Sequence, residues 1–155
     1  MSISAPRWDL TNVYPSLESN EFKAAVEEYK KQVSSLEKLF KNKLSKANAR
    51  TKASDLAPSL GKAIDQINRI QTLAATIEPF IQSFVTTDSR NKAAMKALSE
   101  FEQAKLTMSQ LLTRFTAWLG AISLKLDQIV KANSSARAHE FMLREAAEQS
   151  KYLMS

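Results

Sequence analysis

The sequence has no cysteine, and it has only two glycines and four prolines among its 155 residues. Without cysteine the chain has no disulfide, no thiolate metal site and no cysteine nucleophile, which fits a reducing cytoplasm, where we expect the protein to lie. Glycine and proline most often end helices, so their scarcity predicts a few long helices. Because Gly61 and Gly120 are far apart, the sequence also excludes a glycine-rich phosphate-binding loop.

Long apolar runs are also lacking. No stretch approaches the roughly 20 apolar residues that span a bilayer, and the first residues lack the basic and then apolar pattern of a secretory signal. We therefore expect no membrane partner. Hydrophobic residues make up 44% of the chain and charged residues 25%, which indicates a globular protein rather than a disordered one. The length fits a single domain.

Three stretches repeat apolar residues every three or four positions, which is the spacing of one helix face. They predict a helix over about 20–42 that is capped by Ser19 or Asn20, a helix that begins near 54–57, and a helix over about 89–122. The apolar positions of the three stretches are Phe22, Val26, Tyr29, Val33, Leu36 and Phe40, then Leu60, Ile64, Ile67, Ile70, Leu73 or Ala74, Ile77, Ile81 and Phe84, then Met95, Leu98, Phe101, Ala104, Met108, Leu111, Phe115, Trp118 and Ile122.

Proline and polar residues predict where these helices bend or stop. Pro58 fits a first helical turn, whereas Pro79 removes a hydrogen-bond donor inside the second helix. Because the apolar spacing continues past Pro79, we expect a kink near Ala75–Phe80 rather than a break. The polar run 86–89 separates the second helix from the third, and its residues are typical of helix caps.

The remainder completes an all-α fold. A short element over 124–131 precedes a final helix over about 135–151, which Asn133 or Ser134 would cap. We expect an up-and-down bundle of about four long antiparallel helices. A short non-helical lead over 1–18 precedes the helical domain 19–155. The lead is expected to dock on the bundle through Trp8, Leu10 and Tyr14, because burying large aromatic side chains stabilises a fold.

The net charge of +6 is partly local. Five basic residues, and no acidic one, lie between positions 41 and 52, at Lys41, Lys43, Lys46, Arg50 and Lys52. Such a stretch is either a phosphate-contacting patch or a solvated loop between helices. We favour the loop, because no aromatic residue stands among the lysines to stack on bases. Nucleic acid is therefore not an expected partner.

Residues for catalysis are scarce. His139 is the single histidine, and Leu143 occupies the position one helical turn later where an H-E-x-x-H zinc site needs its second histidine. We expect His139 to be a partly buried or interfacial residue of the last helix. A serine nucleophile needs a histidine-type base held by a third group, which one histidine in a helical setting does not favour.

Paired carboxylates do not converge either. Glu27 and Glu28 are adjacent and point apart on a helix, as do Glu100 and Glu102. The sequence therefore predicts no catalytic, cofactor-binding or metal-binding residue in this chain.

The first residues nevertheless carry a distinctive motif. Trp8-Asp9-Leu10, followed by Val13-Tyr14-Pro15-Ser16, resembles the amino terminus of the oligoendopeptidase F family of zinc peptidases. The break 86–89 is similar to the short threonine- and aspartate-containing break between that family's second and third helices. The final stretch 151–155 resembles its Tyr-Leu-Leu/Met-Ser segment. The order of the predicted elements also matches the family's helical amino-terminal region.

The resemblance implies a zinc-dependent endopeptidase that acts on short, unfolded peptides. In that family an H-E-x-x-H helix and a downstream Glu hold the zinc, and the motif's own Glu acts as the base. None of these positions exists here, so the resemblance implies zinc only in a full-length enzyme. This chain would be a non-catalytic wall or lid over the cleft. Its partners would be the missing catalytic domain and, in the whole enzyme, oligopeptide substrates. The apolar cluster Tyr152, Leu153 and Met154 also favours a fragment that more chain covers.

Two other readings stay open. The chain could be a free-standing helical interaction module that binds a partner helix or forms a homodimer, and a concentration-dependent dimer would indicate this. It could also be a basic nucleic-acid binder. That reading requires retention on DNA or RNA that weakens steeply with salt.

Overall fold

The structure is a computed structural model that describes residues 11–48 and 50–153, with only the backbone of Leu153. Within this part of the chain every regular element is helical and none is a strand, which confirms the all-α bundle. The helices are α1 (Asn20–Leu39), α2 (Ala53–Thr87), α3 (Lys92–Ala121), α4 (Leu126–Ala132), α5 (Ser134–Ala138) and α6 (Glu140–Leu153).

Side-chain caps fix where three of the helices begin. The Ser19 hydroxyl accepts a hydrogen bond from the Phe22 amide at 3.2 Å, so Ser19 rather than Asn20 caps α1. The Asn91 side chain accepts from the Ala94 amide at 3.0 Å and starts α3 three residues later than the sequence predicts. Asn133 accepts from the Ala136 amide at 2.9 Å and caps α5. Each cap satisfies an amide that has no partner inside its helix.

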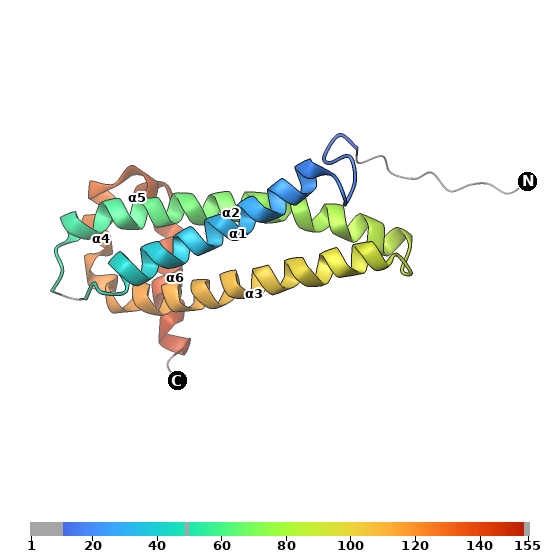
Figure 1. Cartoon of the computed structure of the whole chain (residues 1–155). Helices are drawn as coiled ribbons and strands as arrows, with labels where there is room; N and C mark the ends of the chain where they lie inside the picture. Colours follow the sequence, from blue (N-terminus) through green and yellow to red (C-terminus); the bar gives the residue numbers. More distant parts are fainter. Residues whose placement is uncertain (1–10, 49, 154–155) are drawn as a thin grey trace, which may run out of the picture.

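The three long helices form the body of the molecule, in which α2 runs antiparallel to both α1 and α3 (Figure 1). Their buried faces follow the predicted apolar spacing, with fully buried side chains such as Tyr29, Ile64 and Phe101. Met95 is an exception, because it is 53% exposed while Ala94 is fully buried. Ala94 and Met95 lie four and three residues before Leu98, and both spacings are compatible with one helix face. The sequence analysis placed Met95, the larger side chain, on the buried face, and this prediction was wrong.

Helix α2 is continuous through Pro79, so the chain does not break there. Figure 1 shows α2 changing direction along its second half, in keeping with the expected kink. Pro79 cannot donate to the Ala75 carbonyl, and both residues are exposed, so water can reach that carbonyl. Pro58 lies within the second turn of α2, which begins at Ala53.

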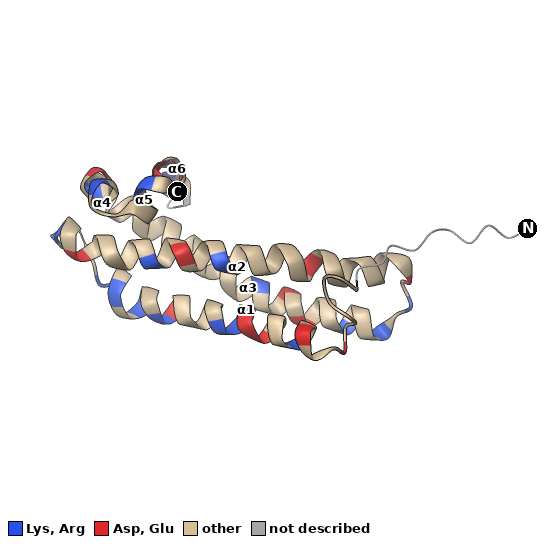
Figure 2. Ribbon diagram, turned by 90° about the horizontal axis from the view of Figure 1, so that it is seen from above, with Lys and Arg blue, Asp and Glu red and all other residues tan. Residues whose placement is uncertain are grey.

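The end of the chain departs most from the expected arrangement. The short element expected over 124–131 is present as α4, which ends at the extended Asn133, whereas the final helix expected over 135–151 is divided at His139 into α5 and α6. Helices α4 and α5 pack on α2, whereas α6 packs against α3. Figures 1 and 2 show that α6 crosses α3 instead of running along it. The helices α4, α5 and α6 therefore form a C-terminal layer on one end of a three-helix body.

The only two glycines of the sequence lie where this layer touches the body. A Cβ at Gly61 of α2 would overlap the Asn133 side chain, and a Cβ at Gly120 of α3 would overlap the Ser150 hydroxyl of α6. Ser150 is 3% exposed and donates a hydrogen bond to the Ala147 carbonyl at 2.6 Å. Glycine inside a helix costs stability, and here it permits close helix packing.

Residues 11–19 form a non-helical turn before α1. The Tyr14 ring packs edge-on against Phe22 at 5.6 Å and against Phe80 at 5.0 Å, between ring centroids. This burial raises the pKa of Tyr14 above its ordinary value of 10.0. Trp8 and Leu10, the other expected contacts of the lead, lie outside the described residues. Among the described helices, none is long and apolar enough to cross a membrane.

Candidate binding surfaces

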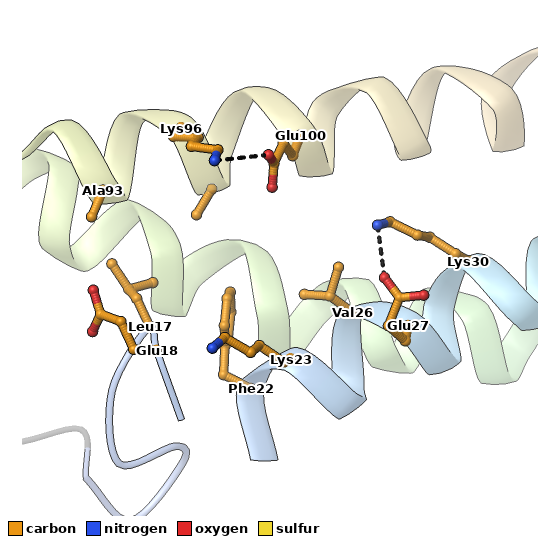
Figure 3. Close-up of a pocket in the computed structure, with 11 residues that line it drawn as sticks. Leu17, Glu18, Phe22, Lys23, Val26, Glu27, Lys30, Ala93, Lys96 and Glu100 are labelled. Carbon is orange, nitrogen blue, oxygen red and sulfur yellow. Dashed lines mark hydrogen bonds and ion pairs between the residues drawn. The ribbon is translucent and has the colours of Figure 1, made fainter. Parts of the chain in front are cut away.

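A solvent-open groove of about 460 Å³ lies between the first turns of α1 and α3 (Figure 3). Its floor is apolar and its rims carry both signs of charge. We call it the α1/α3 groove, and its lining residues are Leu17, Glu18, Phe22, Lys23, Val26, Glu27, Lys30, Ala93, Lys96, Ala97 and Glu100.

Small residues on α3 leave the space open. Ala93 and Ala97 of α3 line the groove together with Phe22 and Val26 of α1, and Figure 3 shows Ala93 across from Leu17. Alanine side chains are too short to close the gap, and Leu17 closes one end. The groove can therefore accept apolar side chains from outside the described residues.

The charges on the rims are partly neutralised within each helix. Lys30 pairs with Glu27 at 2.8 Å on α1, and Lys96 lies 3.8 Å from Glu100 on α3. Glu18 and Lys23 form no ion pair with any described residue. One acidic and one basic side chain thus remain available at the end of the groove that lies nearest the lead.

A second hollow, of about 360 Å³, surrounds the single histidine. His139 is half-buried between α5 and α6, and its Nε2 lies 2.9 Å from the Asn68 amide nitrogen of α2. The expectation of an interfacial histidine is confirmed, although His139 stands at the break between two helices rather than inside one. Leu143, one turn later, is fully buried in the core.

This hollow does not fit zinc. Its other lining residues are Ile67, Gln71, Leu112, Phe115, Thr116, Met142 and Ala146, and none of them offers a carboxylate or a second imidazole. No group of three His, Cys, Asp or Glu residues within residues 11–48 and 50–153 is placed to hold a metal ion.

The outward side of α6 exposes two large aromatic side chains. Phe141 is 80% exposed and Tyr152 is 78% exposed. They are eleven residues apart, which is close to three helical turns, so they lie on one face. Glu145 and Glu148 lie between them on that face, opposite the buried Leu143. We call Phe141, Glu145, Glu148 and Tyr152 the α6 outer face.

Arg144 of α6 forms an ion pair with α4 beside the α6 outer face. Its guanidinium donates to Asp127 and to Glu140, each at 2.6 Å, and these hydrogen bonds raise the pKa of Arg144 above its ordinary value. Exposed ion pairs contribute little to stability. Arg144 therefore orients α6 more than it stabilises the fold.

The other charged residues that the sequence analysis considered stay apart. Glu27 pairs with Lys30, while Glu28 contacts Gln32 and Arg69. Glu100 and Glu102 are both exposed. Two carboxylates that act together on one substrate would have to face each other, and these do not.

The basic stretch is exposed, as expected. Lys41 and Lys43 lie in a turn of π-helix at Phe40–Leu44, in which the Ser45 amide donates to the Phe40 carbonyl at 2.8 Å. Figure 2 shows basic residues at this end of α1. Leu44 and Ala47 are buried beneath them. The connector is thus partly helical and anchored, whereas the sequence predicted a solvated loop.

Sequence reasoning missed the α1/α3 groove. The periodicity of α1 and α3 identifies Phe22, Val26 and Leu98 as core residues, but it does not show how far apart two helices lie. The alanines at 93 and 97 are the only sequence signal, because a pair of small residues one turn apart marks a place of close packing or of open space. Comparison of the chain with known protein families, with curated proteins and with solved structures gives no match.

Proposed function

We propose that this chain is the non-catalytic N-terminal helical region of an oligoendopeptidase F-like zinc metalloendopeptidase. The observation that carries the proposal is the α6 outer face, where Phe141 and Tyr152 are each about four-fifths exposed. Burying one such side chain is worth about 1.5–3 kcal/mol. Two of them on one face are therefore typical of a surface that another domain covers. The resemblance at residues 8–16, 86–89 and 151–155 suggests which domain that is.

In this proposal the chain forms part of the cleft and contributes no catalytic group. The catalytic domain would contribute the zinc, its ligands and the base that activates water. The three-helix body would form part of the wall or lid of the cleft and would limit access to short, unfolded peptides. The antiparallel packing of α1, α2 and α3 supports such a role, because a wall must keep its shape while peptides pass.

The reading frame beyond codon 155 gives the first test. A downstream H-E-x-x-H motif would support the proposal. A stop codon directly after Ser155 would favour a free-standing interaction module instead. The exposed α6 outer face is compatible with that second function too, and sedimentation of the purified chain at several concentrations would reveal a dimer.

The second test uses two separate polypeptides, this chain and the downstream part that bears the motif. We expect the chain alone to show no chelator-sensitive cleavage of a fluorogenic oligopeptide, and to bind the downstream part. Phe141→Glu should weaken that binding by about tenfold or more, since buried aromatic anchors dominate interfaces.

Met95→Glu is the matched control, because Met95 is a 53% exposed apolar residue on the body rather than on α6. It should leave the binding unchanged. Chelator-sensitive cleavage by the chain alone would contradict its non-catalytic role. Equal loss of binding in both variants would contradict the assignment of the α6 outer face.

A further inference from the structure

The hollow around His139, which we call the His139 hollow, lies between the three-helix body and the C-terminal layer. Each of three helices lines it with residues about one turn apart, which is the spacing of one helix face. These pairs are Asn68 and Gln71 of α2, Leu112 and Thr116 of α3, and Met142 and Ala146 of α6. Three helix faces therefore enclose one space of about 360 Å³.

The C-terminal layer does not close this space by moving onto the body. The side chains of Asn133 and Ser150 already lie against Gly61 of α2 and Gly120 of α3. Both glycines are about one to three helical turns from the hollow along their own helices. The two contacts thus hold α6 at a fixed distance from the body, and the short side chain of Ala146 leaves the space between them open.

The walls of the His139 hollow are mostly apolar and carry no formal charge. Ile67 and Phe115 are each 5% exposed, whereas Gln71 and Met142 are exposed and lie where the hollow meets solvent. No lysine, arginine, aspartate or glutamate of the described chain lines it. Moving a charged molecule out of water without a countercharge is costly. The hollow is therefore suited to an uncharged molecule with a large apolar part.

The Thr116 hydroxyl is available for hydrogen bonding. The hydroxyls of Thr72, Thr76 and Thr113 each donate to the carbonyl four residues earlier in their helix. The Thr116 hydroxyl makes no such bond, nor any other within residues 11–48 and 50–153. Its oxygen is not fully buried, so water can satisfy it, and a ligand can replace that water.

The histidine offers a second group. The Asn68 amide nitrogen can only donate, so Nε2 of His139 accepts its hydrogen bond at 2.9 Å. The proton of the neutral ring is then on Nδ1, for which the described part of the chain provides no acceptor. The Asn68–His139 bond also fixes the ring between α2 and α6. The hollow thus combines apolar walls with a few polar groups, which is typical of small-molecule sites.

We propose that the His139 hollow binds a compact, uncharged and largely apolar small molecule, which packs against Ile67 and Phe115 and forms a hydrogen bond with the Thr116 hydroxyl. The volume of about 360 Å³ lies in the lower part of the range of about 300–1,000 Å³ for such sites. The site would be formed by this chain alone. It does not depend on the proposed peptidase role, and each proposal can fail without the other.

The test uses 2-naphthol as the probe, because it joins two apolar rings to one hydroxyl. The full chain is labelled with ¹³C-methyl methionine, and Met142→Leu assigns the Met142 signal among those of the five methionines. We expect this signal to shift saturably with 2-naphthol. The signal of Met95, which is exposed on α3 and does not line the hollow, should stay in place. The anion 2-naphthoate has the same rings and should bind about tenfold more weakly or worse.

Two variants locate the probe, each with a matched control. Thr116→Val keeps the shape but removes the hydroxyl, and should weaken binding by about twofold to tenfold. Thr107→Val, at an exposed position of α3 outside the hollow, should leave binding unchanged. Ala146→Leu fills the hollow and should abolish the shift, whereas Ala24→Leu on the exposed side of α1 should not. If Ala146→Leu does not fold, the comparison of Thr116→Val with Thr107→Val decides.

Three results would overturn the inference. The Met142 signal shows no saturable shift at any soluble concentration of 2-naphthol, which would mean that only water fills the hollow. The probe and 2-naphthoate bind equally well, which would contradict an uncharged ligand. Binding is the same in Thr116→Val as in Thr107→Val, which would place the probe away from the Thr116 hydroxyl.

Discussion

Tyr29 lies where the three long helices meet. It belongs to α1, is 2% exposed and packs its ring 4.9 Å from Phe101 of α3, between centroids. Glu78 of α2 is held nearby by Lys105, whose ammonium lies 2.6 Å from each carboxylate oxygen. Burial, and then the negative charge of Glu78, raise the pKa of Tyr29 above its ordinary value of 10.0.

The raised pKa makes stability depend on alkaline pH. Above pH 10 the tyrosine of the unfolded chain loses its proton while Tyr29 in the fold keeps it, so the unfolded state binds fewer protons. The contribution of Tyr29 is complete below pH 10 and is lost as pH rises through the folded pKa. We expect urea midpoints to fall as the pH rises above 10, and to fall less in Tyr29→Phe. Equal loss in both proteins would contradict this assignment.

At the residue scale, the sequence predicted part of what the structure shows. The spacing from Phe22 to Phe40 placed Tyr29 in the core, and the single histidine was expected at an interface. The partners of these residues were not predictable, since His139 meets Asn68, which is 71 positions away in the sequence. Nothing in local sequence encodes a contact between helices that far apart.

At the scale of elements, the caps decide where helices start. The run 86–89 was expected to begin the third helix near residue 89, but Asp88 accepts from the Arg90 amide at 2.9 Å and forms a turn instead. Asn91 then caps α3. Asp and Asn favour both turns and caps, so the sequence alone does not choose between the two positions.

Removing the Asn91 side chain tests this cap. Asn91→Ala leaves the Ala94 amide without its acceptor and should lower the free energy of unfolding by about 1 kcal/mol. In a chain of this length that corresponds to a melting temperature lower by about 2–4 °C. Asn91→Asp keeps an acceptor and should change little. Asn42→Ala, at an exposed position in the π-helical turn, is the control.

At the scale of the whole molecule, two glycine contacts join the C-terminal layer to the body. Gly61 receives Asn133 and Gly120 receives Ser150. Elsewhere in a helix, replacing glycine by alanine stabilises by roughly 0.5–1 kcal/mol. At these two positions a methyl group would separate the layers instead, so the expected sign is reversed.

Gly120→Ala measures this directly. We expect it to lower the free energy of unfolding by about 1–3 kcal/mol, as overpacking does, and to speed hydrogen exchange of the α6 amides. Ser150→Gly removes the atoms that the new methyl group would meet. The double variant should therefore recover part of the loss. Additive effects of the two substitutions would show that the residues are not in contact.

The sequence by itself determined the all-α class, the three long helices and most of their buried faces, because helix periodicity and the scarcity of glycine and proline are local properties. Only the tertiary structure decided that the last helix crosses α3, that a groove stays open between α1 and α3, and that the helix face bearing Phe141 and Tyr152 points outward. These depend on distances between helices, and side-chain volumes at contacts such as Gly120–Ser150 set those distances.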